Sequence, residues 1–393
     1  FNSPVEDNVF VISADVKDVM LDEWVAFSDK YNSFDKSSRL TKQTASQGTP
    51  KNDEINFIYD IDIGTLSVKD KQFNDLGVMG ERANGQWRSQ FNHALAAGEL
   101  TVYDDVSTPV NIALEYLHLT KKESKDEGVV LNDDPLANVD LSWLKPTTVS
   151  IKQLTYDKSD FGQWRLTLNP FSDGVSVNDI HATFSGMTLS GQEGGGAEFF
   201  WRTQSASNDG DVFSSSSETQ FAGKLQGAGV QELFKIWGGE PVLTSKQTSI
   251  TGDFSWLGSP AAFSIEAMRG SLAVQLSDGV FVQNTGAASS GILKLLGLFN
   301  FNTWARRLQL DFSDFYKKGV AYDTLNTRFL FDEGNIYFQQ PLVVKAPSSE
   351  FTMAGTIDYL SEDIDAVLVT TLPVGGNLTF ATALVAGLPT AVG

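Results

Sequence analysis

The 393-residue sequence predicts a mainly β protein built around a long, curled antiparallel β-sheet. Apolar and polar residues alternate over many short stretches, which is the two-residue period of a half-buried strand. Turn signals separate these stretches every 8–12 residues or so, which predicts roughly twenty to twenty-five strands. At a spacing of about 4.8 Å, a sheet of twenty strands is on the order of 95 Å long. Such a sheet cannot stay flat, and it must curl, close or split.

The first quarter of the chain combines strands with one short helix. Strands are expected at residues 9–12 and 14–20, and an amphipathic helix at 19–31, with a polar, exposed loop at 32–54. The apolar side of this helix is formed by Leu21, Trp24, Val25 and Phe27. From residue 55 the hydrophobic period changes to two. The apolar face of the expected strand carries Ile55, Phe57, Tyr59, Ile61 and Ile63. These residues predict a strand with one apolar and one polar face.

The middle of the chain contains a weak internal repeat. Residues 65–78 resemble residues 153–166, and both copies read as strand, polar turn and strand. Residues 190–220 are rich in Gly and Ser, which predicts flexible hairpin tips. A second short amphipathic helix is expected at 230–237, closed by the glycines that follow it. Alternation then returns at 248–256.

Residues 289–315 combine a helix and a strand. Ser289 and Ser290 suit the start of a helix. An apolar stripe at helical spacing follows, formed by Ile292, Leu295, Leu296 and Phe299. Beyond Arg306 and Arg307 the period becomes two, with Leu308, Leu310 and Phe312 on one face. We therefore expect an apolar helix that leads into a half-buried strand.

Regular strands are expected in the last quarter of the chain, at residues 322–331, 336–344, 351–359 and 364–372. The final apolar segment, residues 376–393, is rich in small residues and is expected to begin another helix. We divide the chain into a meander at 1–224 and a second groove segment at 225–393, which are expected to be continuous. Because the sequence begins at Phe1 and ends at Gly393 within an apolar run, we expect it to be part of a larger protein.

The composition excludes several classes of function. Acidic residues outnumber basic ones by 49 to 29, and the formal net charge is −20. Nucleic-acid binding needs clustered Lys and Arg, so no nucleic-acid partner is expected. Strong attraction to an anionic membrane surface is excluded for the same reason. The sequence has no cysteine, and it contains no apolar run long enough to span a bilayer.

Catalytic and metal-binding motifs are also lacking in the sequence. His93, His118 and His181 each stand alone, without a second His at metal-ligand spacing. None of the common hydrolase, zinc-protease or phosphate-loop patterns occurs. Pairs of carboxylates such as Asp60 and Asp62 are expected by chance in so acidic a chain, and solvated strand faces explain them. We therefore expect no enzyme, no catalytic residues, no metal and no cofactor.

The aromatic residues leave two interpretations open. The chain has 27 Phe, 9 Tyr and 8 Trp, and many of them occupy the apolar face of a predicted strand. A closed sandwich core explains this pattern, and so does a curled sheet whose inner face holds long apolar ligands. Alternation is required in both cases and does not separate them.

Several segments resemble one known family. Residues 255–263 (SWLGSPAAF), 295–301 (LLGLFNF) and 306–323 (RRLQLDFSDFYKKGVAYD) carry the resemblance, together with FTMAGTIDY at 351–359. They are similar to the C-terminal region of the YhdP-type members of the AsmA-like family, which group with TamB and other repeating β-groove proteins. The similarity is firm over residues 225–393 and loose over 1–224.

This resemblance implies a β-groove (β-taco) fold in the bacterial envelope. Members are anchored in the inner membrane by an N-terminal helix, cross the periplasm as a sheet with an apolar channel, and are thought to move phospholipid towards the outer membrane. It implies that this chain is a periplasmic segment that binds phospholipid acyl chains and serves outer-membrane lipid homeostasis, with envelope partner proteins that are not identified. The alternatives are a closed structural or protein-binding β-module without lipid cargo, and a carbohydrate-active enzyme with a facing carboxylate pair.

Together, the one-sided alternation and the resemblance predict the residues that line the groove: Leu295, Phe299, Leu308, Leu310, Phe312, Phe329, Phe331, Phe338, Leu342, Val344, Phe351, Met353 and Ile357. Arg306 and Arg307 stand between the predicted helix and strand. They are candidates for contact with a phosphate head group, and a solvated pair at the start of a strand is the alternative. The helices at 230–237 and 291–299 are expected to plug or line the groove ends.

Overall fold

The computed structural model describes residues 9–21, 56–68, 71–105, 107–120, 143–203, 217–236, 240–282, 320–347, 349–361, 363–374 and 378–388, together with residues 23, 134, 136, 139 and 141. The chain forms two compact units. Unit 1 comprises Phe1–Lys121 and Pro146–Asp157, and unit 2 comprises Lys122–Lys145 and Lys158–Gly393. Within the described ranges, no helix has the length and apolar character needed to cross a membrane.

Unit 1 is a sheet of mixed direction. Its strands are β1 (Val9–Met20), β2 (Asn56–Val68), β3 (Lys71–Ala83), β4 (Gln86–His93), β5 (Ala96–Tyr103), β6 (Val110–Leu119), β7 (Thr147–Ile151) and β8 (Leu154–Tyr156). Strands β2 to β6 are joined as antiparallel neighbours in chain order. Strand β1 runs parallel to β2, and β7 and β8 run parallel to β6. Parallel pairs need longer connections than hairpins, and β1 and β6 are each followed by such a connection.

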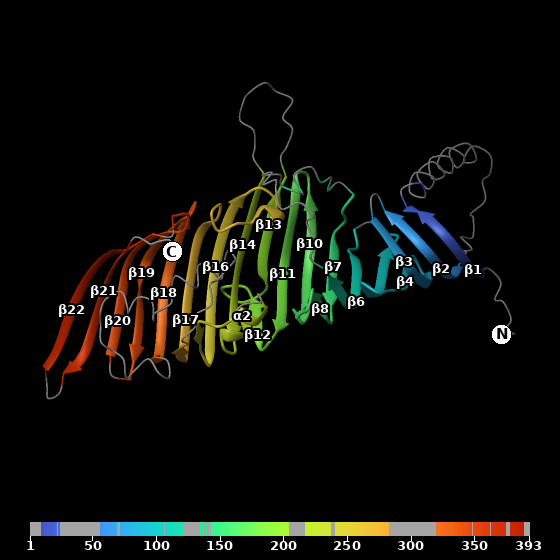
Figure 1. Ribbon diagram of the computed structural model, residues 1–393. Helices are drawn as coiled ribbons and strands as arrows, with labels where there is room; N and C mark the ends of the chain where they lie inside the picture. Colours follow the sequence, from blue (N-terminus) through green and yellow to red (C-terminus); the bar gives the residue numbers. More distant parts are fainter. Residues whose placement is uncertain are drawn as a thin grey trace, which may run out of the picture. The chain divides into compact units, whose positions relative to one another are not determined.

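The described part of unit 2 contains antiparallel strands and very little helix. Its strands are β9 (Ser159–Asp160), β10 (Gln163–Phe171), β11 (Gly174–Phe184), β12 (Met187–Ser190), β13 (Ala197–Arg202), β14 (Glu218–Gly227), β15 (Leu243–Thr244), β16 (Gln247–Leu257), β17 (Arg269–Phe281), β18 (Val320–Asp332), β19 (Asn335–Ala346), β20 (Ser349–Asp358), β21 (Asp363–Val374) and β22 (Leu378–Leu388). Helix α2 (Gln231–Ile236) follows β14, and the short 3₁₀ helix η1 (Pro260–Ala262) follows β16. Strands β16 to β22 pair in chain order and lie side by side (Figure 1).

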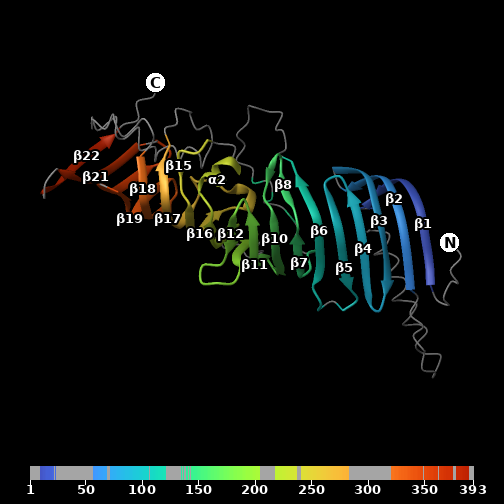
Figure 2. The same cartoon turned by 90° about the horizontal axis from the view of Figure 1, so that it is seen from below.

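The core of unit 2 lies on one face of this sheet. Along β18, Leu325, Thr327, Phe329 and Phe331 are buried, whereas Arg328 and Leu330 between them are exposed. Helix α2 adds Leu233 and Phe234 to the same buried cluster. Two views at right angles place α2 beside β12 and β16 (Figure 1 and Figure 2). The apolar face of the sheet is therefore covered in part by a helix that interrupts the run of strands.

The structure confirms the predicted fold class. The chain is mainly β, its sheet is largely antiparallel, and the helix expected at 230–237 is present as α2. The strand expected at 14–20 is present in β1, and Leu21 and Glu23 are helical as expected. The predicted start of that helix was wrong, because Val19 and Met20 belong to β1, which pairs with β2 as far as Met20. One further prediction was wrong. The segment expected to become a C-terminal helix contains β22, which pairs with β21 along its whole length. The helix expected at 291–299 and the strand expected at 308–313 lie outside the described residues.

Candidate functional site

A continuous apolar surface crosses strands β16 to β21 of unit 2. Side chains of one face meet their neighbours on the next strand in rows that run across the sheet. One row passes through Leu276, Leu325, Val344 and Phe351. Another row passes through Leu342, Met353 and Leu368. Because paired residues on adjacent strands present side chains to the same face, each row extends the apolar surface by about 4.8 Å per strand.

Strand β19 contains an irregularity at the centre of this surface. Its register with β20 runs from Tyr337 opposite Thr356 to Leu342 opposite Met353. Between these two pairs, β19 advances by five residues and β20 by three, so β19 contains a bulge. Pro341 lies in the bulged segment. A proline donates no ladder hydrogen bond, so a bulge accommodates it. Because two extra residues preserve the parity of alternation, Ile336 and Leu342 both face the apolar side.

Glycine at position 270 brings two phenylalanines together. Gly270 on β17 lies between Phe254 on β16 and Phe331 on β18 in the register. The two rings meet across it with centroids 6.0 Å apart in an edge-to-face arrangement. A Cβ at this position would lie 2.0 Å from the carbonyl oxygen of Asp253, and Gly270 has a φ of +130°. Only glycine fits here, and its missing side chain leaves the rings in contact at the floor of the site.

Helix α2 is fastened to the sheet by a small buried polar network. The Val230 N–H donates to Ser245 Oγ over 3.0 Å, and the Ser245 N–H donates to Gln231 Oε1 over 3.1 Å. The Ser245 and Thr248 hydroxyls are 2.9 Å apart, and both residues are buried. These bonds satisfy the polar groups that the helix carries into the apolar interior. They hold Leu233 and Phe234 over the sheet.

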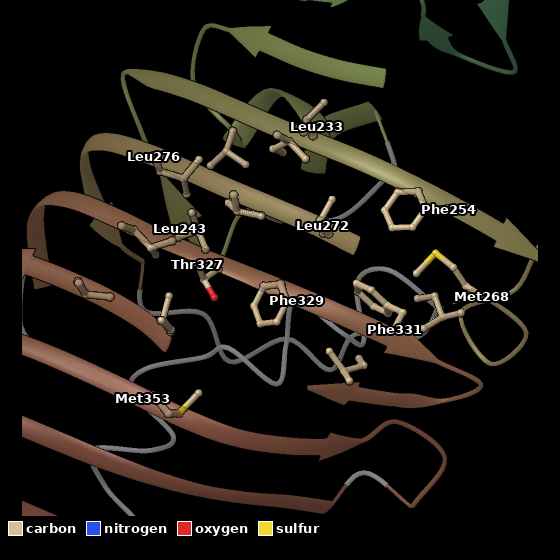
Figure 3. A pocket seen from close by; sticks show the side chains of 18 of the residues that line it. Leu233, Leu243, Phe254, Met268, Leu272, Leu276, Thr327, Phe329, Phe331 and Met353 are labelled. Atoms are coloured by element: carbon tan, nitrogen blue, oxygen red, sulfur yellow. The ribbon is translucent and has the colours of Figure 1, made fainter. Parts of the chain in front are cut away.

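The space between α2 and the apolar face of the sheet is a partly open cavity of about 390 Å³. Strands β14 to β21 line it together with α2 and the β16–β17 link, which contributes Phe263, Ile265 and Met268. Figure 3 shows side chains from α2 and from several strands converging on it, including Leu233, Leu276, Phe329 and Met353. Its volume lies within the range of ligand pockets, about 300–1,000 Å³.

The wall of the cavity is almost entirely apolar. Among the described lining residues, Trp256 has an indole N–H that donates to a backbone carbonyl oxygen, and the other polar side chain is that of Thr327. Its hydroxyl donates to the Gln340 carbonyl oxygen over 3.2 Å and so turns its polar atom towards the backbone. The described part of the wall contains no ionisable side chain. No three His, Cys, Asp or Glu side chains gather at metal-binding distance in the described ranges. This chemistry favours an apolar ligand over a polar one.

A sequence profile of the family described as "YhdP protein" matches residues 2–393. The chain belongs to the YhdP family. A protein of Escherichia coli (strain K12) named "Intermembrane phospholipid transporter YhdP" is 23% identical to the chain over 307 residues. Those residues make up 76% of this chain and 22% of the relative, so the chain spans about a fifth of the length of the curated relative that it matches. No solved structure matches the chain.

Membership of the YhdP family confirms the resemblance predicted from the sequence, and the match covers the loosely similar first half as well. Of the predicted groove residues, six line the cavity: Phe329, Phe331, Leu342, Val344, Phe351 and Met353. Ile357 is buried in the same core, and Phe338 packs against it. The remaining predicted positions lie outside the described residues: Leu295, Phe299, Leu308, Leu310, Phe312, and the candidate head-group residues Arg306 and Arg307.

Sequence reasoning missed one wall of the cavity in this YhdP-family chain. Strand β17 contributes Leu272, Val274 and Leu276. Their strict alternation was a usable signal. Helix α2 was expected at a groove end, but none of its residues was chosen as a site residue. The residues of the β16–β17 link follow neither period, so no sequence pattern indicates them.

The link after β16 is held by a carboxylate. Asp134 accepts hydrogen bonds from the Ser259 hydroxyl and from the Ser259 N–H, the latter over 2.6 Å. The Trp256 indole N–H, whose ring lines the cavity, donates to the Ser259 carbonyl oxygen over 2.9 Å. Burial favours the neutral form of Asp134, but the hydrogen bonds from Ser259 and Leu136 outweigh it and lower the pKa of this carboxyl below its ordinary value.

We expect Asp134→Asn to lower the stability of unit 2 by about 1 kcal/mol at neutral pH, since the charged acceptor is partly exposed to solvent. Because the folded pKa lies below the ordinary value of 3.8, the carboxylate contributes its full stability above that pH. The contribution is lost as the pH falls through the folded pKa. Urea midpoints of the two proteins should therefore differ at pH 7 and converge below pH 3.8. A difference that is the same at both pH values would contradict a role for the charge.

Proposed function

We propose that this chain binds phospholipid acyl chains in the cavity of unit 2 and forms part of a protein that moves phospholipid between the inner and outer membranes. The observation that carries the proposal is the apolar cavity, in whose described wall the polar groups of Thr327 and Trp256 both donate to backbone carbonyl oxygens. The name of the Escherichia coli relative supports the choice of phospholipid as cargo.

The physical argument starts from the absence of polar partners in the described wall. Each buried acyl methylene gains about 0.8 kcal/mol on leaving water, so a chain is held without a single hydrogen bond. The rows of Leu, Phe and Met across β17 to β21 offer similar surroundings at successive strands. A ligand that exchanges one such position for the next loses little free energy. The cavity suits a cargo that moves, and it selects little on chemical grounds.

The proposal also includes location. We place the chain in the periplasm, as a segment of a longer protein that is anchored in the inner membrane, and we assign it no catalytic step. The name "intermembrane phospholipid transporter" of the relative supports this setting. The chain spans 22% of that relative, and the transport activity therefore belongs to the longer protein.

Photo-crosslinking in cells tests the proposal. A photoreactive residue at Phe329 or Phe351 is expected to capture phospholipid, because both side chains line the cavity. The matched controls are Leu330 on β18 and Tyr337 on β19, which are each 39% exposed. Both lie next to cavity-lining residues in the chain, but on the opposite face of the sheet. Adducts are identified by mass spectrometry of the purified protein.

A closed β-module without cargo is the competing function, and one observation favours it. Most of the described lining residues are already well buried, with Phe331 only 2% exposed, as in a finished core. This alternative predicts equal, background labelling at Phe329 and Leu330 and no lipid that co-purifies with the chain. That pair of results would overturn the lipid-binding proposal.

A further inference from the structure

Unit 1 carries an apolar surface of its own. One face of its sheet is formed by rows that cross β2 to β7. These rows contain Ile61, Ile63, Leu76, Val78, Phe91, Leu100, Ile112, Leu114, Val149 and Ile151. Within the described part of unit 1, Leu114 and Ile151 are the buried apolar residues, and the others of this face are half-buried. In contrast to the cavity of unit 2, this surface keeps contact with solvent.

An ion pair lies on this same face. Arg82 is opposite Phe57 on β2 and opposite Trp87 on β4, so its side chain shares their face. Its guanidinium lies 5.7 Å from the centroid of the Trp87 ring, and that ring stacks on Phe57 with centroids 6.1 Å apart. Arg82 Nη2 lies 2.7 Å from Asp104 Oδ2, and these side chains are 23% and 42% exposed. The pair thus sits among aromatic rings and remains open to water.

Other charged side chains on the central strands point away from this face. Asp60 and Asp62 on β2, Arg88 on β4 and Glu99 on β5 occupy the alternate, outward positions, and Arg88 pairs with Glu99 there. An exposed ion pair stabilises a fold by only about 0–1 kcal/mol. Stability therefore gives little reason to place Arg82 and Asp104 on the apolar side. Their placement calls for a ligand that is apolar along most of its length and charged at one end.

We infer that the Arg82–Asp104 pair is a head-group site for a zwitterionic phospholipid whose acyl chains lie along the apolar face of unit 1. The inference rests on the proposed function, lipid binding, and adds a second site and a class of lipid. The guanidinium offers planar, charge-assisted hydrogen bonds to a phosphate. The Asp104 carboxylate accepts from an ammonium, and the Trp87 ring attracts the same cation through its face.

The distances along the strands suit such a ligand. Phe57, beside Arg82, and Ile61 are four residues apart on β2, which is about 13 Å along an extended strand. The acyl chains would begin beyond Tyr59, whose hydroxyl is 2.5 Å from Ser89 Oγ and is thereby occupied. A neutral pair complements a head group with one phosphate and one ammonium, whereas an anionic head group would meet Asp104 without a compensating cation. The site therefore selects zwitterionic over anionic phospholipid.

Asp104 also makes a structural contact, and the test must distinguish loss of that contact from loss of lipid binding. The Asp104 N–H donates to the Gly85 carbonyl oxygen over 2.8 Å, which ties the end of β5 to the β3–β4 turn. A variant of Arg82 can loosen this turn without any effect on a ligand. The ratio of two captured lipids is a readout that a loosened turn does not change, because both lipids share the same acyl chains.

The experiment uses the full chain with a photoreactive residue at Val78, on the apolar face of unit 1. Vesicles contain equal amounts of phosphatidylethanolamine and phosphatidylglycerol with identical acyl chains. We expect adducts at Val78 to be enriched about fivefold in the zwitterionic lipid, and Arg82→Gln to return the ratio to that of the vesicle. Arg88→Gln, on the outward face of β4, is the matched control and should keep the enrichment. Arg82→Asp combined with Asp104→Arg reverses the pair and should also keep it.

The outcomes separate this inference from the function on which it rests. Lipid capture at Val78 with equal ratios in the wild type and Arg82→Gln would overturn the head-group site. Capture at Phe329 without capture at Val78 would overturn the whole second site and leave the proposed function standing. Capture at neither position would overturn both.

Discussion

Replacement of Val274 by tryptophan is expected to block the cavity of unit 2. Val274 lies at the centre of the apolar surface, opposite Ile250 on β16 and Thr327 on β18. An indole at this position projects into a space of about 390 Å³ and displaces ligand atoms. If the ring displaces two acyl methylenes of the lipid from the cavity, binding weakens by about 0.8 kcal/mol for each. The fraction of protein with bound lipid then falls about tenfold. Photo-crosslinking at Phe351 measures the effect, as the yield of phospholipid adduct.

The matched control for this blockade is Gln275→Trp. Gln275 is the next residue on β17 and is exposed on the other face, so the same ring is added outside the cavity. The free energy of unfolding of each variant should lie within about 1.5 kcal/mol of the wild-type value. The cavity accommodates the added ring in Val274→Trp, and the added ring in Gln275→Trp lies in solvent. Unchanged adduct yield in a stably folded Val274→Trp protein would show that acyl chains do not use this space.

The sequence predicts which residues of the cavity strands share the buried face, because this depends on one physical rule. A strand with one buried face must alternate, and Leu325, Phe329 and Phe331 do so along β18. The same rule identified Leu342 and Val344 on β19 in spite of the bulge that precedes them. That success depended on parity: two inserted residues preserve the alternation, whereas one would have turned Leu342 to the outer face.

Closure of the cavity was not readable in the same way. The sequence predicts α2 as an amphipathic helix, but its position depends on contacts between Gln231 and Ser245, fourteen residues apart. The β16–β17 link depends on Asp134, which precedes Ser259 by 125 residues. Neither contact has a period or a motif. Alternation reveals which residues share a face, but these long-range polar contacts decide whether that face becomes a groove, a cavity or a filled core.

The C-terminal strand shows where local preference misled. Residues 378–388 are rich in Ala and Leu and lack the polar alternation of the earlier strands. Ala and Leu favour helix, so a helix was expected. The segment instead pairs with β21 from Leu378 to Leu388, because an available strand edge offers partners for the backbone groups on one side of the segment. The context of a strand outweighs its intrinsic preference, especially when the sheet precedes it in the chain.

An aspartate in place of Thr327 is expected to have the largest effect on stability. Thr327 is 5% exposed in the cavity wall, and its hydroxyl donates to the Gln340 carbonyl oxygen. An ionised carboxylate there would face a carbonyl oxygen and apolar side chains, so unfolding should become easier by about 3–5 kcal/mol at pH 7. Burial raises the pKa of such a group, and its protonated form can donate to Gln340 as the threonine does. The deficit should therefore shrink as the pH falls through that raised pKa.

Urea denaturation between pH 7 and 4 measures the trend, with Thr327→Val as the neutral control, whose deficit of about 1 kcal/mol should not depend on pH. A deficit in Thr327→Asp that is small at pH 7, or that does not recover in acid, would mean that water reaches this wall and that the cavity is not a dry site for acyl chains.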